Sequence, residues 1–201
     1  MYQVIDNLIP KSFQNSLESL FNSQNFMWYY LDNIRINNEA IIYKDKNITD
    51  APGLGHVIFD PNSTFPNSQH LDKILPILYF LEDKLKINIH EVKRIRLRKT
   101  LQTANHNENK YNPPHIDLND AEEFYSLVYY VNESDGDTFL FSNKFTQGDL
   151  TFNDDPIILT RVSPKKGRGF FFKGKIFHSG NCPINYKKRI IINFDFTIRN
   201  Q

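Results

Sequence analysis

Short strand-like segments recur along the second half of this 201-residue chain, and they constrain its fold more than any other feature. From residue 92 to 101, apolar and basic residues alternate, as in a strand with one buried face. Runs rich in aromatic and β-branched residues follow, at residues 124–131, 138–141, 157–162, 169–173 and 188–198. Turn-forming pieces such as ESDGD, FNDDP and SPKKG separate them. The pattern predicts a mainly β protein, either a closed barrel or two packed sheets.

The first 90 residues contain two helical patterns and one aromatic run. Residues 11–23 place apolar side chains three and four positions apart, with Ser12 as a candidate N-cap. Residues 69–85 present a second apolar helical face, which Pro76 should kink or split. Between them, residues 26–31 (FMWYYL) predict a strand that belongs to the core. We expect these N-terminal helices to pack outside the β structure.

Length and charge limit the class of protein. No linker divides the chain, so we expect a single domain, with residues 1–90 as support and residues 91–198 as the β core. The net charge of +1 disfavours nucleic acid and anionic membranes as partners. No apolar run is long enough to span a bilayer, and the first residues lack a signal-peptide pattern. These features indicate a cytoplasmic protein.

The single cysteine, Cys182, restricts the metal chemistry that is available to the chain. It can form neither an internal disulfide nor a thiolate-rich site, so a metal would need histidine and carboxylate ligands. Such a set begins at His115 and Asp117, which would project from the same side of an extended segment. His178 would supply a third ligand from another strand. Two imidazoles and one carboxylate on one face are the arrangement of non-haem Fe(II) oxygenases.

The strand-like run KRIIINFDFTI, residues 188–198, has two unlike faces. One row is mostly apolar and the other is mixed polar, and the polar row contains Arg189, Ile191, Asn193 and Asp195. A small barrel that holds a ligand would turn this polar row inward and leave the apolar row under the helices.

Four segments together resemble a known family: PPHIDLND, YYVNESDGDTFLF, SPKKGRGFFFKGKIFHSG and RIIINFDF. In this order and spacing they resemble the Fe(II)- and 2-oxoglutarate-dependent dioxygenases, within them the prolyl 4-hydroxylase-like branch of small bacterial and phage type. The resemblance covers residues 91–198. It implies a double-stranded β-helix, or jelly roll, with N-terminal helices packed outside the barrel.

The resemblance also implies roles for single residues. His115, Asp117 and His178 would be the iron ligands and form the catalytic centre. Arg189 would pair with the far carboxylate of 2-oxoglutarate, because a guanidinium can grip a carboxylate with two parallel bonds. Lys188 is the rival anchor, although strand parity puts it on the opposite face. Tyr130 would donate its hydroxyl to the same carboxylate, with a purely buried aromatic as the alternative.

The activity implied is a dioxygenase of the hydroxylase type that uses Fe(II), 2-oxoglutarate and O₂, with ascorbate as a candidate stimulant. It would couple oxidative decarboxylation of 2-oxoglutarate to C–H oxidation of a prolyl peptide or a small molecule. We expect a monomer or homodimer, in the host cytoplasm if the gene is from a phage. The alternative is a non-catalytic jelly-roll module that binds a sugar, a peptide or a structural metal. A cupin-type metalloenzyme is disfavoured, because HIDLND lacks the additional His and Glu ligands that it normally needs.

Other polar residues receive simpler interpretations. His106 and Tyr111 lie in a polar loop that we expect to be solvated, and the remaining histidines are expected to be surface or core residues: His56, His70 and His90. The basic run around SPKKGRG is expected to be a solvated hairpin turn. A GxxxxGK match at residues 169–175 is rejected as a phosphate-binding loop, because Ile176 offers no hydroxyl to Mg²⁺.

Overall fold

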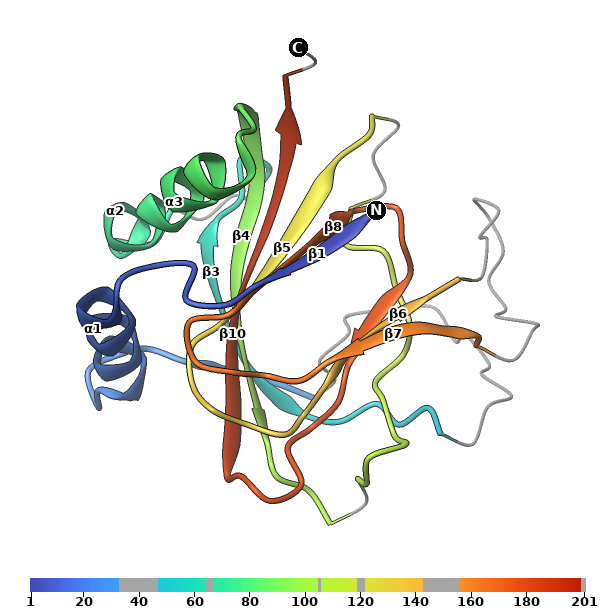
Figure 1. The fold of residues 1–201 in the computed structure, drawn as a ribbon. Coiled ribbons are helices and arrows are strands. Elements are labelled where there is room, and N and C mark those ends of the chain that lie inside the picture. Colours follow the sequence, from blue (N-terminus) through green and yellow to red (C-terminus); the bar gives the residue numbers. More distant parts are fainter. Residues whose placement is uncertain (33–46, 64–66, 105, 119–121, 143–155, 200–201) are drawn as a thin grey trace.

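Two antiparallel sheets form most of the structure, a computed structural model that describes residues 1–32, 47–63, 67–104, 106–118, 122–142 and 156–199 (Figure 1). The larger sheet has seven strands in the order β1-β8-β5-β10-β4-β3-β2, and the smaller has three in the order β7-β6-β9. The strands of the larger sheet are β1 (Tyr2–Ile5), β2 (Tyr29–Leu31), β3 (Gly53–Phe59), β4 (Ile89–Leu101), β5 (Tyr125–Tyr130), β8 (Gly169–Lys173) and β10 (Lys188–Ile198). The strands of the smaller sheet are β6 (Thr138–Phe141), β7 (Ile158–Val162) and β9 (His178–Gly180).

Strict alternation along β10 separates the two faces of the larger sheet. Ile190, Ile192 and Phe194 belong to a core cluster on the helix side. Ile191 lies on the other face, in a second cluster that occupies part of the space between the two sheets. Because successive side chains of a strand point to opposite faces, β10 carries the core on one side and the inter-sheet space on the other. The prediction of an apolar row under the helices is confirmed.

Three helices cover the outer face of the larger sheet (Figure 1). They are α1 (Lys11–Asn22), α2 (Leu71–Ile74) and α3 (Pro76–Leu85). The break between α2 and α3 falls at Leu75, and Pro76 is the first residue of α3, where its missing N–H is not needed. The predicted split of this helix is confirmed. Within the described residues, no helix has both the length and the apolar character needed to cross a bilayer.

The predicted N-cap of α1 is wrong. Ser12 lies inside the first turn, because the helix begins at Lys11 and its N-cap is Pro10, which makes no side-chain capping bond. Proline fixes its own φ and so starts the helix through backbone geometry instead of a side-chain hydrogen bond.

The first 90 residues contribute strands as well as helices. β1 pairs with β8, and β3 pairs with β4, although neither strand was predicted. The run at residues 26–31 is a strand only from Tyr29. Phe26 is buried, whereas Tyr29 and Tyr30 are exposed, so the core assignment holds for the beginning of this run and not for its end.

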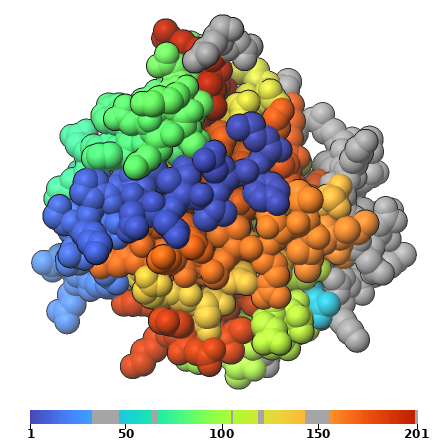
Figure 2. All heavy atoms as spheres, viewed as in Figure 1, coloured from blue at the N-terminus to red at the C-terminus, as the bar shows by residue number. Residues whose placement is uncertain are grey.

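The hairpin predicted at the basic turn is wrong, because β7 pairs with β6 and β8 pairs with β1 and β5, so the turn connects the two sheets. Acidic side chains from the N-terminal segment hold this turn. Arg168 and Lys165 both contact Asp6, and Lys166 pairs with Glu18 of α1. Figure 2 shows the N-terminal segment, in blue, lying along this orange part of the surface. The turn predicted from SPKKG is present, but its charges serve to attach the N-terminus to the sheet.

Candidate metal centre

His115 and His178 lie directly opposite each other in an antiparallel bridge. The backbone N–H of His115 donates to the carbonyl of His178 at 2.9 Å, and the N–H of His178 donates to the carbonyl of His115 at 3.0 Å. In such a pair the two side chains leave the backbone on the same side, and the ring centroids are 4.5 Å apart. Two residues far apart in the sequence are therefore positioned by reciprocal main-chain bonds.

Both imidazoles have the same local support. The Nδ1 atom of His115 is 3.0 Å from the carbonyl oxygen of Pro113, and the Nδ1 atom of His178 is 3.3 Å from the carbonyl oxygen of Ile176. A carbonyl accepts only, so each Nδ1 carries the proton and donates it two residues back along the chain. This contact fixes ring orientation and leaves Nε2 as the metal-binding atom, as in many metal sites.

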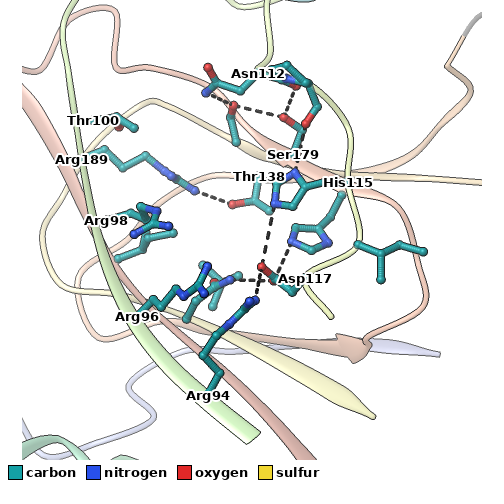
Figure 3. Close-up of a pocket in the computed structure, with 17 residues that line it drawn as sticks. Arg94, Arg96, Arg98, Thr100, Asn112, His115, Asp117, Thr138, Ser179 and Arg189 are labelled. Atoms are coloured by element: carbon teal, nitrogen blue, oxygen red, sulfur yellow. Dashed lines mark hydrogen bonds and ion pairs between the residues drawn. The ribbon is translucent and has the colours of Figure 1, made fainter. Parts of the chain in front are cut away.

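Asp117 completes the predicted set. Its Oδ2 atom is 3.1 Å from Nε2 of His178, and its Oδ1 atom is 4.0 Å from Nε2 of His115. One ligand atom from each of the three residues lies within 4.8 Å of the others, which is compatible with a single ion (Figure 3). The structure therefore brings together the three residues that the sequence analysis selected.

Two side chains from the larger sheet hold the Asp117 carboxylate. Arg94 of β4 donates to Oδ1 at 2.9 Å, and Asn193 of β10 donates to Oδ2 at 2.8 Å. Burial opposes ionisation of Asp117, but the charges and hydrogen bonds of His178, His115 and Arg94 outweigh it. These contacts hold the pKa of Asp117 well below its usual range. The carboxylate is thus anionic and oriented, as a metal ligand has to be.

A buried ion pair lies behind Asp117 that the sequence analysis missed. Arg94 also contacts Oδ2 of Asp195, from Nη2 at 2.9 Å and from Nε at 3.2 Å. Ser126 of β5 donates to the other oxygen of Asp195 at 2.8 Å. Burial and the nearby Asp117 charge raise the pKa of Asp195. Strand parity could have placed both residues at the site, because Arg94 lies on the inward row of β4 and Asp195 on the inward row of β10.

A cavity of about 330 Å³ opens beside the three residues, between the two sheets. Most of the residues that line it are polar, and four of them are arginines: Arg94, Arg96, Arg98 and Arg189. Figure 3 shows these arginines on the side of the cavity that faces His115 and Asp117. The alternation predicted for residues 92–101 is confirmed, but the basic row of this strand faces the cavity and not bulk solvent.

Arg189 is 3% exposed and donates from Nη2 to Oγ1 of Thr138 at 2.6 Å. Its Nε atom is buried without a hydrogen-bond partner, and among the described residues no carboxylate forms an ion pair with it. Burial lowers the pKa of Arg189, with a smaller opposing effect from Tyr130. A buried guanidinium with free bonding capacity is suited to an anionic ligand.

The other two candidate anchors lie away from the cavity wall. Lys188, the neighbour of Arg189 in β10, points outward and donates to Asn22 of α1. Tyr130 is fully buried behind Thr138 and donates its hydroxyl to Oγ1 of that residue at 2.7 Å. Thr138 thus joins Tyr130 to Arg189 and lines the cavity itself. A direct contact of Tyr130 with a ligand stays a prediction.

The remaining candidates do not line the cavity. His56 is buried and bonds Met27 and Ser68, and His70 stacks on Phe26. The expectation that the loop before His115 is solvated is wrong for His106 and Tyr111, because both are buried. Tyr111 packs in an apolar cluster, with its ring centroid 5.3 Å from that of Phe139. Burial raises the pKa of Cys182 to about 11, so it is not an activated nucleophile.

Solved structures with a similar fold are known, although no family model and no curated protein sequence matches the chain. A 2OG-Fe(II) oxygenase family oxidoreductase from Burkholderia pseudomallei aligns with a TM-score of 0.64 at 12% identity, covering 99% of this chain and 86% of that one. A prolyl-4-hydroxylase from Pseudomonas putida aligns with a TM-score of 0.54 at 13% identity, covering 99% and 93%.

A viral collagen prolyl hydroxylase from Paramecium Bursaria Chlorella virus-1, solved as a 2OG complex, aligns with a TM-score of 0.51 at 15% identity, covering 98% and 96%. These alignments extend over nearly the whole chain, the first 90 residues included. Together with the two-sheet topology, they show that this chain has the jelly-roll fold of the 2OG-Fe(II) oxygenases.

Proposed function

We propose that this protein is an Fe(II)- and 2-oxoglutarate-dependent dioxygenase of the hydroxylase type. The proposal is carried by one observation: the same cavity has the His115, Asp117 and His178 set on one wall and the buried Arg189 on another. The fold shared with 2OG-Fe(II) oxygenases supports it. All 201 residues would form one oxygenase domain.

The donor set fits Fe(II), because two imidazoles and one carboxylate on one face leave open positions for other ligands. Arg189 and Thr138 would hold the distal carboxylate of 2-oxoglutarate, with Tyr130 keeping Thr138 in place. With Fe(II) and 2-oxoglutarate bound, the site would use O₂ as the oxidant: one oxygen atom would go to the succinate formed from 2-oxoglutarate with loss of CO₂, and the other would convert a substrate C–H bond to an alcohol.

The residues of this chain contribute geometry and charge. The His115 and His178 bridge fixes two ligands, while Arg94 and Asn193 orient the third. Ile191 and Val128 line the cavity as apolar residues and help to keep water out of the site. The substrate would be a prolyl peptide or a small molecule. One relative of this fold, from Trichoplax adhaerens, is a prolyl hydroxylase in complex with a peptide fragment.

The test is addition of Fe(II) and 2-oxoglutarate without oxygen, followed by measurement of the weak visible charge-transfer band of the chelate. We expect the band in the unmodified protein and its loss in Asp117→Ala and His178→Ala. In Arg189→Ala the apparent 2-oxoglutarate affinity should fall about 10- to 100-fold, the size expected for lost charge-assisted bonds.

Lys188→Ala is the matched control, because this neighbouring residue faces α1. A band that never forms in the unmodified protein would overturn the proposal and favour the non-catalytic binding module. Loss of affinity in Lys188→Ala with retention in Arg189→Ala would instead assign the anchor to Lys188.

A further inference from the structure

Arg98 belongs to a row of arginines on β4 that faces the cavity. Arg94, Arg96 and Arg98 alternate with the buried Ile95 and Leu97, so all three project into the space between the sheets. In register, Arg98 lies opposite Ile191 of β10, one step from Arg189 along the inward row. Figure 3 shows the Arg98 guanidinium between those of Arg96 and Arg189.

Each of the other cavity arginines has a counter-charge or a ligand that would supply one. Arg94 contacts Asp117 and Asp195, and Arg96 contacts Asp60 at 3.4 Å. Under the proposed function, Arg189 pairs with one carboxylate of 2-oxoglutarate, while the other carboxylate binds the metal. Both carboxylates of the cosubstrate are then already bound.

Arg98 has no comparable partner among the described residues. Its one hydrogen bond there runs from Nη1 to the carbonyl oxygen of Leu97, at 3.3 Å. Burial and repulsion from Arg96 lower the pKa of Arg98 to about 10, so it remains a cation at neutral pH. A partly buried cation is costly to keep without an anion near it.

The sheet leaves room for this side chain. Gly55 of β3 lies opposite Arg98 in the β3–β4 register. A Cβ atom at position 55 would lie 2.7 Å from Nη1 of Arg98, closer than side-chain atoms approach one another. The guanidinium therefore packs directly over Gly55, and a side chain at position 55 would make it shift.

We propose that Arg98 binds an oxyanion of the substrate, a carboxylate or a phosphate, so that the substrate is a small organic acid. This inference rests on the proposed function and selects among its substrates. A guanidinium presents two parallel donors to such a group. A prolyl residue within a peptide carries no oxyanion and would leave the Arg98 charge without a partner. The cavity volume of about 330 Å³, shared with the cosubstrate, favours a metabolite-sized molecule.

The experiment uses the protein loaded with Fe(II) and saturating 2-oxoglutarate, without oxygen. The probes are N-acetyl amino acids, their uncharged methyl esters, and methyl phosphate, and the readouts are perturbation of the charge-transfer band and calorimetric binding. We expect acids to bind and esters not to. Arg98→Gln should weaken acid binding about 10- to 100-fold, while the band itself still forms. Arg98→Lys, which keeps the charge and loses the two-pronged geometry, should fall between.

Lys99→Gln is the matched control, because Lys99 lies on the opposite face of β4 with its Nζ 4.0 Å from the centre of the Trp28 ring. It should bind the acids as the unmodified protein does. The inference is overturned if the band forms but no acid or phosphate binds, if esters bind as well as acids, or if Arg98→Gln retains full affinity. Failure of the band itself is a separate result that concerns the proposed function. Preference for methyl phosphate over the acids would assign the oxyanion as a phosphate.

Discussion

Asp117 shows how the centre depends on residues that do not touch the metal position. Its two oxygens are contacted by Arg94 and Asn193 from adjacent strands of the larger sheet. Arg94 in turn is held by Asp195, and Asp195 by Ser126. The carboxylate is therefore oriented by a chain of buried polar contacts that runs across β4, β10 and β5.

Arg94→Met should affect both stability and metal binding. It removes the hydrogen bonds from Arg94 to the buried Asp195 carboxyl and leaves that group without its cation. Because burial and the Asp117 charge raise the pKa of Asp195 to about 7, the carboxyl should take up a proton, and the loss of stability should be about 1 to 3 kcal/mol. It also frees the Asp117 side chain, and loss of such supporting contacts lowers metal affinity about 10- to 100-fold. Urea unfolding and Fe(II) titration measure the two effects.

A double variant separates the two effects. Arg94→Met combined with Asp195→Leu should recover part of the stability, because the Asp195 carboxyl no longer has to be buried without its partner, and it should not recover metal affinity. Lys99→Met, on the outer face of β4, is the control. Unchanged Fe(II) affinity in Arg94→Met would show that Asp117 needs no support from this residue.

Sequence patterns located the three candidate ligands but not their supports. His115 and Asp117 share a face through simple strand parity, and His178 follows in a β context. Arg94 and Asp195 are 101 residues apart, and their pairing depends on the alignment of β4 with β10. A single sequence does not encode that register in any short pattern.

At the scale of elements, strands marked by alternating apolar residues or an aromatic run could be predicted, whereas β1 and β3 could not. β3 contains Gly53 and Gly55, which favour turns in sequence-based interpretation. In the structure Gly55 lies within β3, directly under the Arg98 side chain of the neighbouring strand. β1 has four residues at the edge of the sheet and is mostly exposed, so no hydrophobic pattern marks it.

The loop that leads into β10 is fastened by Asp135. Its Oδ1 accepts the backbone N–H of Ile184 at 2.9 Å, and its Oδ2 accepts that of Asn185 at 2.7 Å. Burial alone would raise the pKa of Asp135, but these backbone hydrogen bonds outweigh it and lower the pKa. The ionised form is thus favoured by folding.

Asp135→Asn should lower the free energy of unfolding by about 1 kcal/mol at neutral pH, a modest value because Asp135 is partly exposed to solvent. A lowered native pKa gives stability that is present above the unfolded pKa of about 3.9 and is lost as the pH falls through the native value. The difference between the two proteins should therefore shrink below pH 4.

Denaturant unfolding at a series of pH values provides the measurement. Asp83→Asn, at an exposed position of α3, is the control and should change stability little. A difference that stays constant down to the acid limit would mean that the carboxylate charge is not what fastens this loop.

At the scale of the whole molecule, the candidate site joins the two sheets. His178 and Thr138 come from the smaller sheet, and Arg189, Asn193 and Arg94 come from the larger. A ligand that contacts both groups binds the folded protein and not the unfolded chain. Binding of this kind stabilises the fold by an amount that grows with the logarithm of the ligand concentration relative to the dissociation constant.

Mn(II) with 2-oxoglutarate should therefore raise the melting temperature more than either alone. At 100 times the dissociation constant the gain is about 2.7 kcal/mol. For a domain of this size, that corresponds to a rise of roughly 5 to 10 °C. Differential scanning fluorimetry measures the rise.

Arg189→Ala should respond to Mn(II) but gain little more from 2-oxoglutarate. Asp117→Ala should respond to neither ligand. An equal rise in Asp117→Ala and the unmodified protein would place ion binding elsewhere on the molecule.

The two faces of β10 have a consequence for how related sequences can differ in length. Deleting one residue inside this strand would turn the Arg189 row toward the helices and the Ile190 row toward the cavity, so core and site would be lost together. A deletion between Gly180 and Lys188 would leave both rows in place, because that segment lies outside β9 and β10. Insertions and deletions in relatives of this chain should therefore gather in the connecting loop and be absent from β10, whereas substitutions within one row, apolar for apolar, should be common.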